Sequence, residues 1–195
     1  MKSTILKPLA FFAFLMVFGM NAMAQSANAN LSASATILDE ITVEQEQDLT
    51  FGQVQVGSNK TIDLDGNVTS SSNGISTVGT GVGRFMLAAG AGSNVKLSFT
   101  LPAALDGPNS ETLPISFTED PTGTALDLVG YGNSDDANGV TRFSAINGVD
   151  IAAFPTNAIN NKNGIYVFVG GTVKAAADQA IGQYTGTVTL TAEYN

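Results

Sequence analysis

The sequence contains no cysteine, no histidine and no tryptophan. Without cysteine the chain can form neither disulfides nor a reactive thiol, so its stability must come from its hydrophobic core. Without histidine, the Ser-His-Asp triad, the Cys-His pair, histidine-ligated zinc and histidine acid–base catalysis are all excluded. We therefore expect a protein that is not an enzyme and that uses no cofactor.

Basic residues are also scarce. Eight lysine and arginine residues stand against 17 aspartate and glutamate residues, which gives a net charge of −9. Such a surface repels nucleic acid and anionic lipid, so neither is expected as a partner. The acidic residues are dispersed along the chain, as is typical of a solvated surface.

Residues 1–24 have the three parts of an export signal. Two lysines precede an apolar run over residues 9–20, and Ala22-Met23-Ala24 forms a small-x-small cleavage site. The run is shorter than the ~20 residues of a membrane-spanning helix. We predict that this signal peptide is cleaved and that the mature chain begins at Gln25 without a transmembrane anchor. The signal carries two of the eight basic residues and no acidic residue, so the mature chain has a predicted net charge of −11. Its expected location is the periplasm, the cell surface or the medium.

The composition and periodicity of the mature chain are those of an all-β protein. Glycine, serine, threonine, asparagine and valine dominate, whereas exposed helix positions favour glutamate, lysine, arginine and leucine. Apolar and polar residues alternate over residues 94–101 and 184–194, with the two-residue period of a half-buried strand. We predict a single domain over residues 25–195, a β-sandwich of about eight to ten short strands.

Other segments add detail to this prediction. Residues 165–173 are apolar on both faces and predict a central strand, with Gly170-Gly171 as a bulge or bend. Residues 84–89 and 94–101, joined by a glycine-rich link, predict a hairpin. Residues 120–163 have little periodicity and are expected to form a long loop or insertion. Further strands are expected over residues 33–43, 49–54, 61–64 and 112–118.

Two acidic clusters are candidate calcium ligands. They are Asp63 with Asp65, and Asp135 with Asp136, each among asparagine and glycine residues. Neither cluster has the spacing of a helix-loop-helix calcium site, and such sequences are also what tight turns require, so we favour turns. The same pairs would be the candidates if the chain were a glycosidase, which needs two opposed carboxylates.

The start of the mature chain has its own alternation. Apolar side chains occur at every second position: Ala27, Ala29, Leu31, Ala33, Ala35 and Ile37. The segment is either the first strand of the domain itself or an assembly strand donated to the open sheet edge of a neighbour. The first interpretation is favoured, because donated strands usually carry larger side chains that fill a groove.

Several motifs together resemble a known family of exported bacterial proteins. The motifs are Asp-Leu-Thr-Phe-Gly-Gln-Val at 48–54, Gly-Arg-Phe at 83–85, Leu-Pro at 101–102, Val-Gly-Gly-Thr-Val at 169–173, Gly-Gln-Tyr-Thr-Gly-Thr-Val at 182–188 and Tyr-Asn at 194–195. The family is known mainly as a domain of unknown function and is similar to spore-coat-U-type and pilin-like β-sandwiches. The resemblance implies an immunoglobulin-like sandwich in the envelope or outside the cell, and it carries no catalytic residue.

These observations favour a non-enzymatic secreted or cell-surface protein with a structural or adhesive, fimbria-like role. Its expected partners are copies of itself or other subunits of a surface fibre. The alternative is a monomeric extracellular binding module that recognises a glycan or calcium through the loops of residues 120–163. The sequence names no small-molecule ligand.

Overall fold

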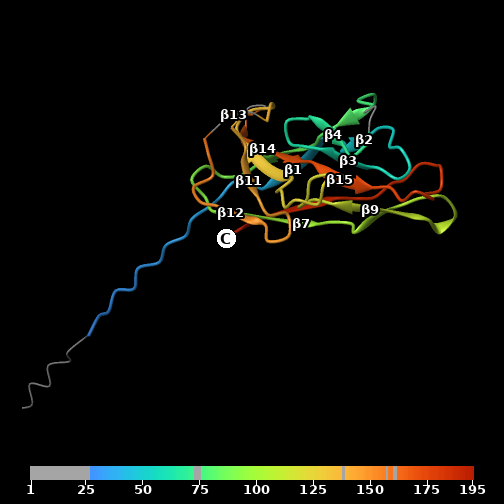
Figure 1. Ribbon diagram of the computed structural model, residues 1–195. Helices are drawn as coiled ribbons and strands as arrows, with labels where there is room; N and C mark the ends of the chain where they lie inside the picture. The colour runs from blue at the N-terminus through green and yellow to red at the C-terminus, as the bar shows by residue number, and fades with distance from the viewer. Residues whose placement is uncertain (1–26, 73–75, 138, 157, 160–161) are drawn as a thin grey trace, which may run out of the picture. The chain divides into compact units, whose positions relative to one another are not determined.

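The computed structural model describes residues 27–72, 76–137, 139–156, 158–159 and 162–195 (Figure 1). The chain divides into two units, residues 1–36 and 37–195, which are described separately. The predicted signal peptide lies outside the described residues. Within the described part of the chain, no helix is both long and apolar enough to cross a membrane.

The second unit is built almost entirely of antiparallel strands, which confirms the β-sandwich. Its described residues form sixteen strands in four sheets, more than the eight to ten expected, because many strands have only two or three residues. The six-stranded sheet has the order β1 (Thr42–Gln47), β6 (Gly83–Ala88), β14 (Lys162–Val169), β10 (Val129–Gly132) and β11 (Thr141–Phe143), with β13 (Ala158–Ile159) paired to β14.

The other sheets are smaller. The five-stranded sheet has the order β4 (Val68–Ser70), β3 (Asn59–Ile62), β15 (Gly171–Lys174), β9 (Thr112–Ser116) and β8 (Ala104–Asp106). The three-stranded sheet has the order β12 (Val149–Ile151), β7 (Val95–Thr100) and β16 (Thr189–Tyr194). A last pair joins β2 (Thr50–Phe51) and β5 (Thr80–Gly81), and a single 3-10 turn, η1, covers Pro108–Ser110.

One continuous stretch of chain links the two largest sheets. β14 lies between β6 and β10 in the six-stranded sheet, and β15 continues it in the five-stranded sheet after a break at Gly170. A Cβ atom at Gly170 would lie 2.3 Å from the carbonyl oxygen of Ile62, so only glycine fits at this bend. The predicted central strand with a glycine bend is therefore confirmed.

The two-residue period correctly identified the buried faces of the strands. In β7, Val95 and Leu97 are fully buried and Lys96 between them is exposed. In β16, Leu190 is buried and Thr191 is exposed, although this strand begins at residue 189 and not at 184. The fully buried side chains that form the core include Ile62, Leu87, Val129, Ile165, Val167 and Val173.

The predicted hairpin of residues 84–89 and 94–101 is wrong. β6 pairs with β1 and β14, whereas β7 pairs with β12 and β16, so the two strands belong to different sheets. The glycine-rich link crosses from one sheet to the other, and it is held by hydrogen bonds from Gly92 N to Phe154 O (2.7 Å) and from Phe154 N to Ser93 O (2.7 Å). Alternation shows which face of a strand is buried but not which strand lies beside it.

The region 120–163 is not the long loop or insertion that we expected. It carries β10, β11, β12 and β13, and these strands pair with one another or with β7 and β14. Strands of two to four residues are too short to produce a visible period. For that reason these four strands could not be recognised among the turn-forming residues of the sequence.

Candidate functional site

The N-terminal segment, residues 27–37, is exposed at every position and contains no strand. Its two largest side chains, Leu31 and Ile37, are 94% and 95% exposed. The strand predicted over residues 33–43 is present only from residue 42, where β1 begins. The sequence favoured a first strand of the domain in this segment, but no strand is present between residues 27 and 41. Donation to a neighbour stays a prediction.

Two strands at the edges of the sandwich each have a single partner within the described part of the chain. β1 pairs with β6, and β16 pairs with β7. The two edge strands approach each other although they belong to different sheets. Tyr194 of β16 holds this region together, because its hydroxyl accepts a hydrogen bond from Gly90 N (2.8 Å) and donates one to Asp39 O (2.5 Å).

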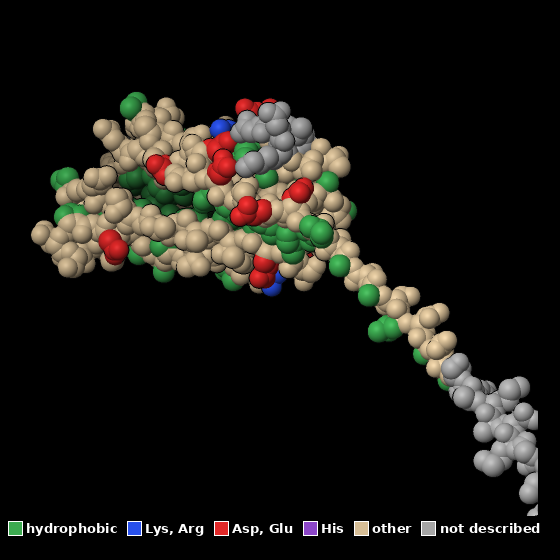
Figure 2. Space-filling model, turned by 180° about the vertical axis from the view of Figure 1, so that it is seen from behind, with side chains coloured by type: hydrophobic (Ala, Val, Ile, Leu, Met, Phe, Trp, Pro, Cys, Tyr) green, Lys and Arg blue, Asp and Glu red, His purple; other side chains and the backbone are tan. Residues whose placement is uncertain are grey.

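Apolar surface stays accessible beside both of these edges. Phe85 faces Gln45 of β1 across the ladder, and Phe99 faces Leu190 of β16; both phenylalanines are only half-buried. Phe99 also stacks on Phe143, with ring centroids 6.1 Å apart. Figure 2 shows hydrophobic side chains on the floor of a hollow that runs along one face of the domain. Buried apolar surface is a large source of binding energy, so such a hollow suits an apolar partner.

The candidate calcium ligand Asp63 forms a turn. Its carboxylate accepts hydrogen bonds from the backbone N–H (2.8 Å) and the side-chain amide (3.1 Å) of Asn67, and Gly66 within the turn has a φ of +75°. Asp65 is exposed and lies 4.0 Å from the guanidinium of Arg142. These hydrogen bonds hold residues 63–67 in a turn.

The second pair of candidate ligands lies on an exposed loop after β10. The carbonyl of Asp135 accepts a hydrogen bond from Arg84 (2.8 Å), and Asp136 is exposed. Arg84 also forms an ion pair with Glu46 (2.9 Å) and lies over the ring of Tyr166. Burial, with the charge of Glu46 as a smaller cause, raises the pKa of Tyr166. Among the described residues, no three acidic, histidine or cysteine side chains are grouped to hold a metal ion.

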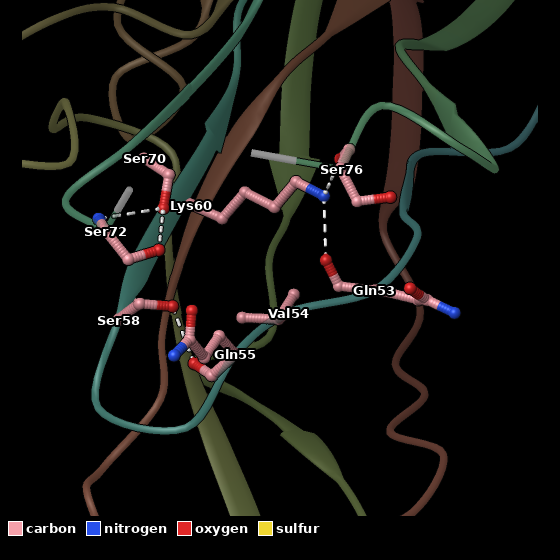
Figure 3. A pocket seen from close by; sticks show the side chains of 8 residues that line it. All are labelled: Gln53, Val54, Gln55, Ser58, Lys60, Ser70, Ser72 and Ser76. Carbon is pink, nitrogen blue, oxygen red and sulfur yellow. Dashed lines mark hydrogen bonds between the residues drawn. The ribbon is translucent and has the colours of Figure 1, made fainter. Parts of the chain in front are cut away.

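The sequence did not reveal a polar pocket beside β3 (Figure 3). Its volume is about 390 Å³. The chain before β3, the strands β3 and β4 and the chain after β4 line it with Gln53, Val54, Gln55, Ser58, Lys60, Ser70, Ser72 and Ser76. Lys60 lies two and four positions before Ile62 and Leu64, which are fully buried, so the alternation places it on the buried face of the strand. A lysine at such a position was the signal in the sequence that could have indicated this pocket.

Lys60 is an unusual lysine because it is only 3% exposed. Its ammonium donates hydrogen bonds to the carbonyls of Gln53 (2.8 Å) and Ser76 (2.7 Å). Within the described part of the chain it forms no ion pair with a carboxylate. Burial lowers the pKa of Lys60 below its ordinary value. Figure 3 shows the ammonium between these two carbonyl-bearing residues at the pocket.

The comparison with known families follows the limits of the folded domain. Residues 41–194 match the family model described as a domain of unknown function, DUF4402. The chain belongs to this family. The DUF4402 match begins one residue before β1 and ends with the last residue of β16, so it leaves the N-terminal segment outside. Membership of a family of unknown function, predicted from the motifs, is confirmed. No curated protein matches the chain.

Proposed function

We propose that this DUF4402 protein is an exported, non-enzymatic structural or adhesive subunit of a surface fibre. In this proposal the N-terminal segment of one copy adds as a strand to the sandwich of the next copy. The observation that carries it is an alternating apolar segment whose described residues are exposed and contain no strand, and which precedes the family domain. We further propose that the motifs of the chain, which resemble those of spore-coat-U-type and pilin-like β-sandwiches, reflect the same role.

The proposed acceptor is the region where β1 and β16 approach each other. Strand addition needs an edge strand that is paired with another strand on one side only, and a place for every second side chain. β1 and β16 are such edge strands. The half-buried Phe85 and Phe99 beside them form an apolar surface on which the side chains of an added strand could pack. Leu31 and Ile37 are the segment's largest apolar side chains, and they would supply most of the buried area.

The length of the segment fits an edge of this size. Eleven extended residues reach about 36 Å at about 3.3 Å per residue, whereas a six-residue strand such as β1 or β16 spans about 20 Å. The segment can therefore cover either edge completely and still leave residues to connect to its own domain. It carries no charge, so it can approach acidic edge residues such as Glu44, Glu46 and Glu193 without repulsion.

Removal of the segment tests the proposal. The mature chain should form oligomers or filaments, and a chain that begins at Ser34 should be monomeric with an unchanged melting temperature. Size-exclusion chromatography with light scattering, together with electron microscopy, measures the assembly state. An unchanged oligomer distribution after truncation would contradict strand donation, as would a mature chain that stays monomeric at high concentration.

A matched pair of point variants sharpens this test. Leu31→Asp places a charge in the proposed donor strand, whereas Ile181→Asp makes a comparable change at an equally exposed apolar residue of the domain, 95% exposed against 94%. We expect Leu31→Asp to weaken assembly at least about tenfold, because burying a charge in an apolar groove is costly, and Ile181→Asp to leave it unchanged. Equal effects of the two variants would point to a loss of general solubility or surface contact instead.

A monomeric binding module is the second candidate function, and the pocket beside β3 favours it. The calcium form of this function can be tested by calorimetric titration of the domain with calcium. Heat of binding and a rise in melting temperature would support it, since a ligand that binds only the folded state must stabilise that state.

A further inference from the structure

We propose that the pocket around Lys60 binds an acidic sugar, with the sugar carboxylate on the Lys60 ammonium and the sugar hydroxyls on the serine and glutamine side chains of the lining. This inference concerns a different surface from the proposed donor strand and does not depend on fibre assembly. Three properties of the pocket carry it: an unneutralised buried cation, a hydroxyl-rich lining and a small volume.

The first property is the charge of Lys60. Removing an ammonium from water is unfavourable unless an anion or enough hydrogen bonds replace the water. An ammonium has three N–H donors, and two are used by the carbonyls of Gln53 and Ser76. The third donor and the net positive charge are left without a partner among the described residues. A carboxylate entering the pocket would satisfy both.

The second property is the chemistry of the remaining lining. Apart from Val54 and Lys60, every lining side chain is a serine or a glutamine. Ser70 and Ser72 have hydroxyl oxygens 3.1 Å apart, and Figure 3 shows these two serines together at one side of the pocket. Hydroxyl and amide groups both donate and accept hydrogen bonds, which suits a ligand with several hydroxyls of its own. Polar surface exceeds apolar surface in the lining, which favours a polar ligand over an apolar one.

The single positive charge of the pocket favours a carboxylate over a phosphate as the bound anion. A single lysine balances a single negative charge, as in a carboxylate, whereas phosphate sites usually combine several cations or the bidentate fork of arginine. The volume of about 390 Å³ is near the lower end of the range of about 300–1,000 Å³ for small-molecule sites, so it suits one sugar unit and not a long oligosaccharide. The lining has no aromatic ring on which a sugar could stack, and we therefore expect millimolar affinity.

The test compares sodium glucuronate with glucose and with sodium sulfate in a titration followed by amide NMR shifts of the mature chain. Glucuronate should shift the amides of the pocket strands β3 and β4 with a saturating, 1:1 curve, and glucose should bind at least about tenfold more weakly. Equal binding of glucose would overturn the role of Lys60 as the anion partner. Binding of sulfate as tight as that of glucuronate would overturn the sugar part, and no saturable shift with glucuronate would overturn the whole proposal.

Variants locate the site. Lys60→Met keeps the length of the side chain and removes the charge, and it should weaken glucuronate binding at least about tenfold. Lys96→Met removes a lysine from the exposed face of β7, where it lies 3.6 Å from Glu193, and should leave binding unchanged. Ser72→Ala serves if Lys60→Met does not fold, and it should weaken binding of glucuronate several-fold. Unchanged glucuronate binding in Lys60→Met, or in Ser72→Ala where that variant is used, would contradict this site.

Discussion

Two buried threonine hydroxyls have opposite environments. The Thr42 hydroxyl, at the start of β1, is buried without a hydrogen-bond partner in the described structure. The Thr172 hydroxyl of β15 is also buried, but it bonds the hydroxyl of Thr61 (2.6 Å) and donates to the carbonyl of Glu119 (2.5 Å). A buried hydroxyl without a hydrogen-bond partner lowers the stability of the folded state, whereas a buried hydroxyl that forms hydrogen bonds contributes to stability.

Valine, which has the shape of threonine without its hydroxyl, should therefore act in opposite directions at these two positions. We expect Thr42→Val to raise the free energy of unfolding by about 1 kcal/mol. We expect Thr172→Val to lower it by about 1–3 kcal/mol, because this variant removes the partner of the buried Thr61 hydroxyl and of the part-buried Glu119 carbonyl. Urea denaturation of the two variants measures this difference. Destabilisation of similar size in both would show that the Thr42 hydroxyl has a partner after all.

The buried lysine makes stability depend on pH. Burial lowers the pKa of Lys60 in the folded state, so between this lowered value and the ordinary value of 10.5 the unfolded chain binds more protons than the folded chain. Stability therefore rises with pH through this window, and the full penalty is present below it.

Lys60→Met should remove this rise. We expect the wild type to gain more stability than Lys60→Met when urea denaturation is repeated from pH 7 to pH 11, while Lys96→Met should follow the wild type. Parallel curves for the wild type and Lys60→Met would show that the ammonium is well solvated in the folded protein.

At the scale of the strand, the bend at Gly170 decides whether the two largest sheets can share one stretch of chain. We expect Gly170→Ala to lower the free energy of unfolding by about 1–3 kcal/mol, because its Cβ atom would lie 2.3 Å from the carbonyl oxygen of Ile62. Gly132→Ala in β10 is the control, since its Cβ atom would come no closer than 3.4 Å to Val140 and should change stability by less than about 0.5 kcal/mol. Thermal unfolding followed by circular dichroism compares the two variants, and equal losses would contradict the importance of the bend.

The buried faces of the strands could be predicted from the sequence, whereas the pairing of the strands could not. The period of two correctly gave the buried faces of β7 and β16, because burial on one face is a local property of each strand. Strand partners depend on contacts far apart in the sequence, and for this reason the link at residues 90–93 was wrongly interpreted as a hairpin turn. The pocket around Lys60 was missed for a similar reason, since its lining comes from chain segments on both sides of β3 and from β4.

For the whole molecule, charge should control assembly. Each mature copy has a predicted net charge of −11, and the proposed acceptor edges include Glu44, Glu46 and Glu193. Copies must therefore repel one another at low ionic strength, although the donor segment itself is uncharged. Salt shortens the range of this repulsion, from about 30 Å at 0.01 M to about 8 Å at 0.15 M.

We expect oligomers of the mature chain to increase when NaCl is raised over this range. Light scattering at constant protein concentration measures the effect, and the chain that begins at Ser34 should remain monomeric throughout. Dissociation of the oligomers by salt would show that ion pairs, and not the burial of an uncharged apolar strand, hold the copies together.

The exposed stretch between residue 27 and β1 is also a site at which proteases can cleave the protein. It contains neither lysine nor arginine, so trypsin has no site there, but its alanines and Leu31 suit an elastase-like enzyme. Exposed chain without secondary structure is cut first, and loss of this stretch would leave all the strands of the family domain intact. In the proposed fibre each joined segment would be shielded as a strand of its neighbour, so an elastase would trim free copies and spare assembled ones.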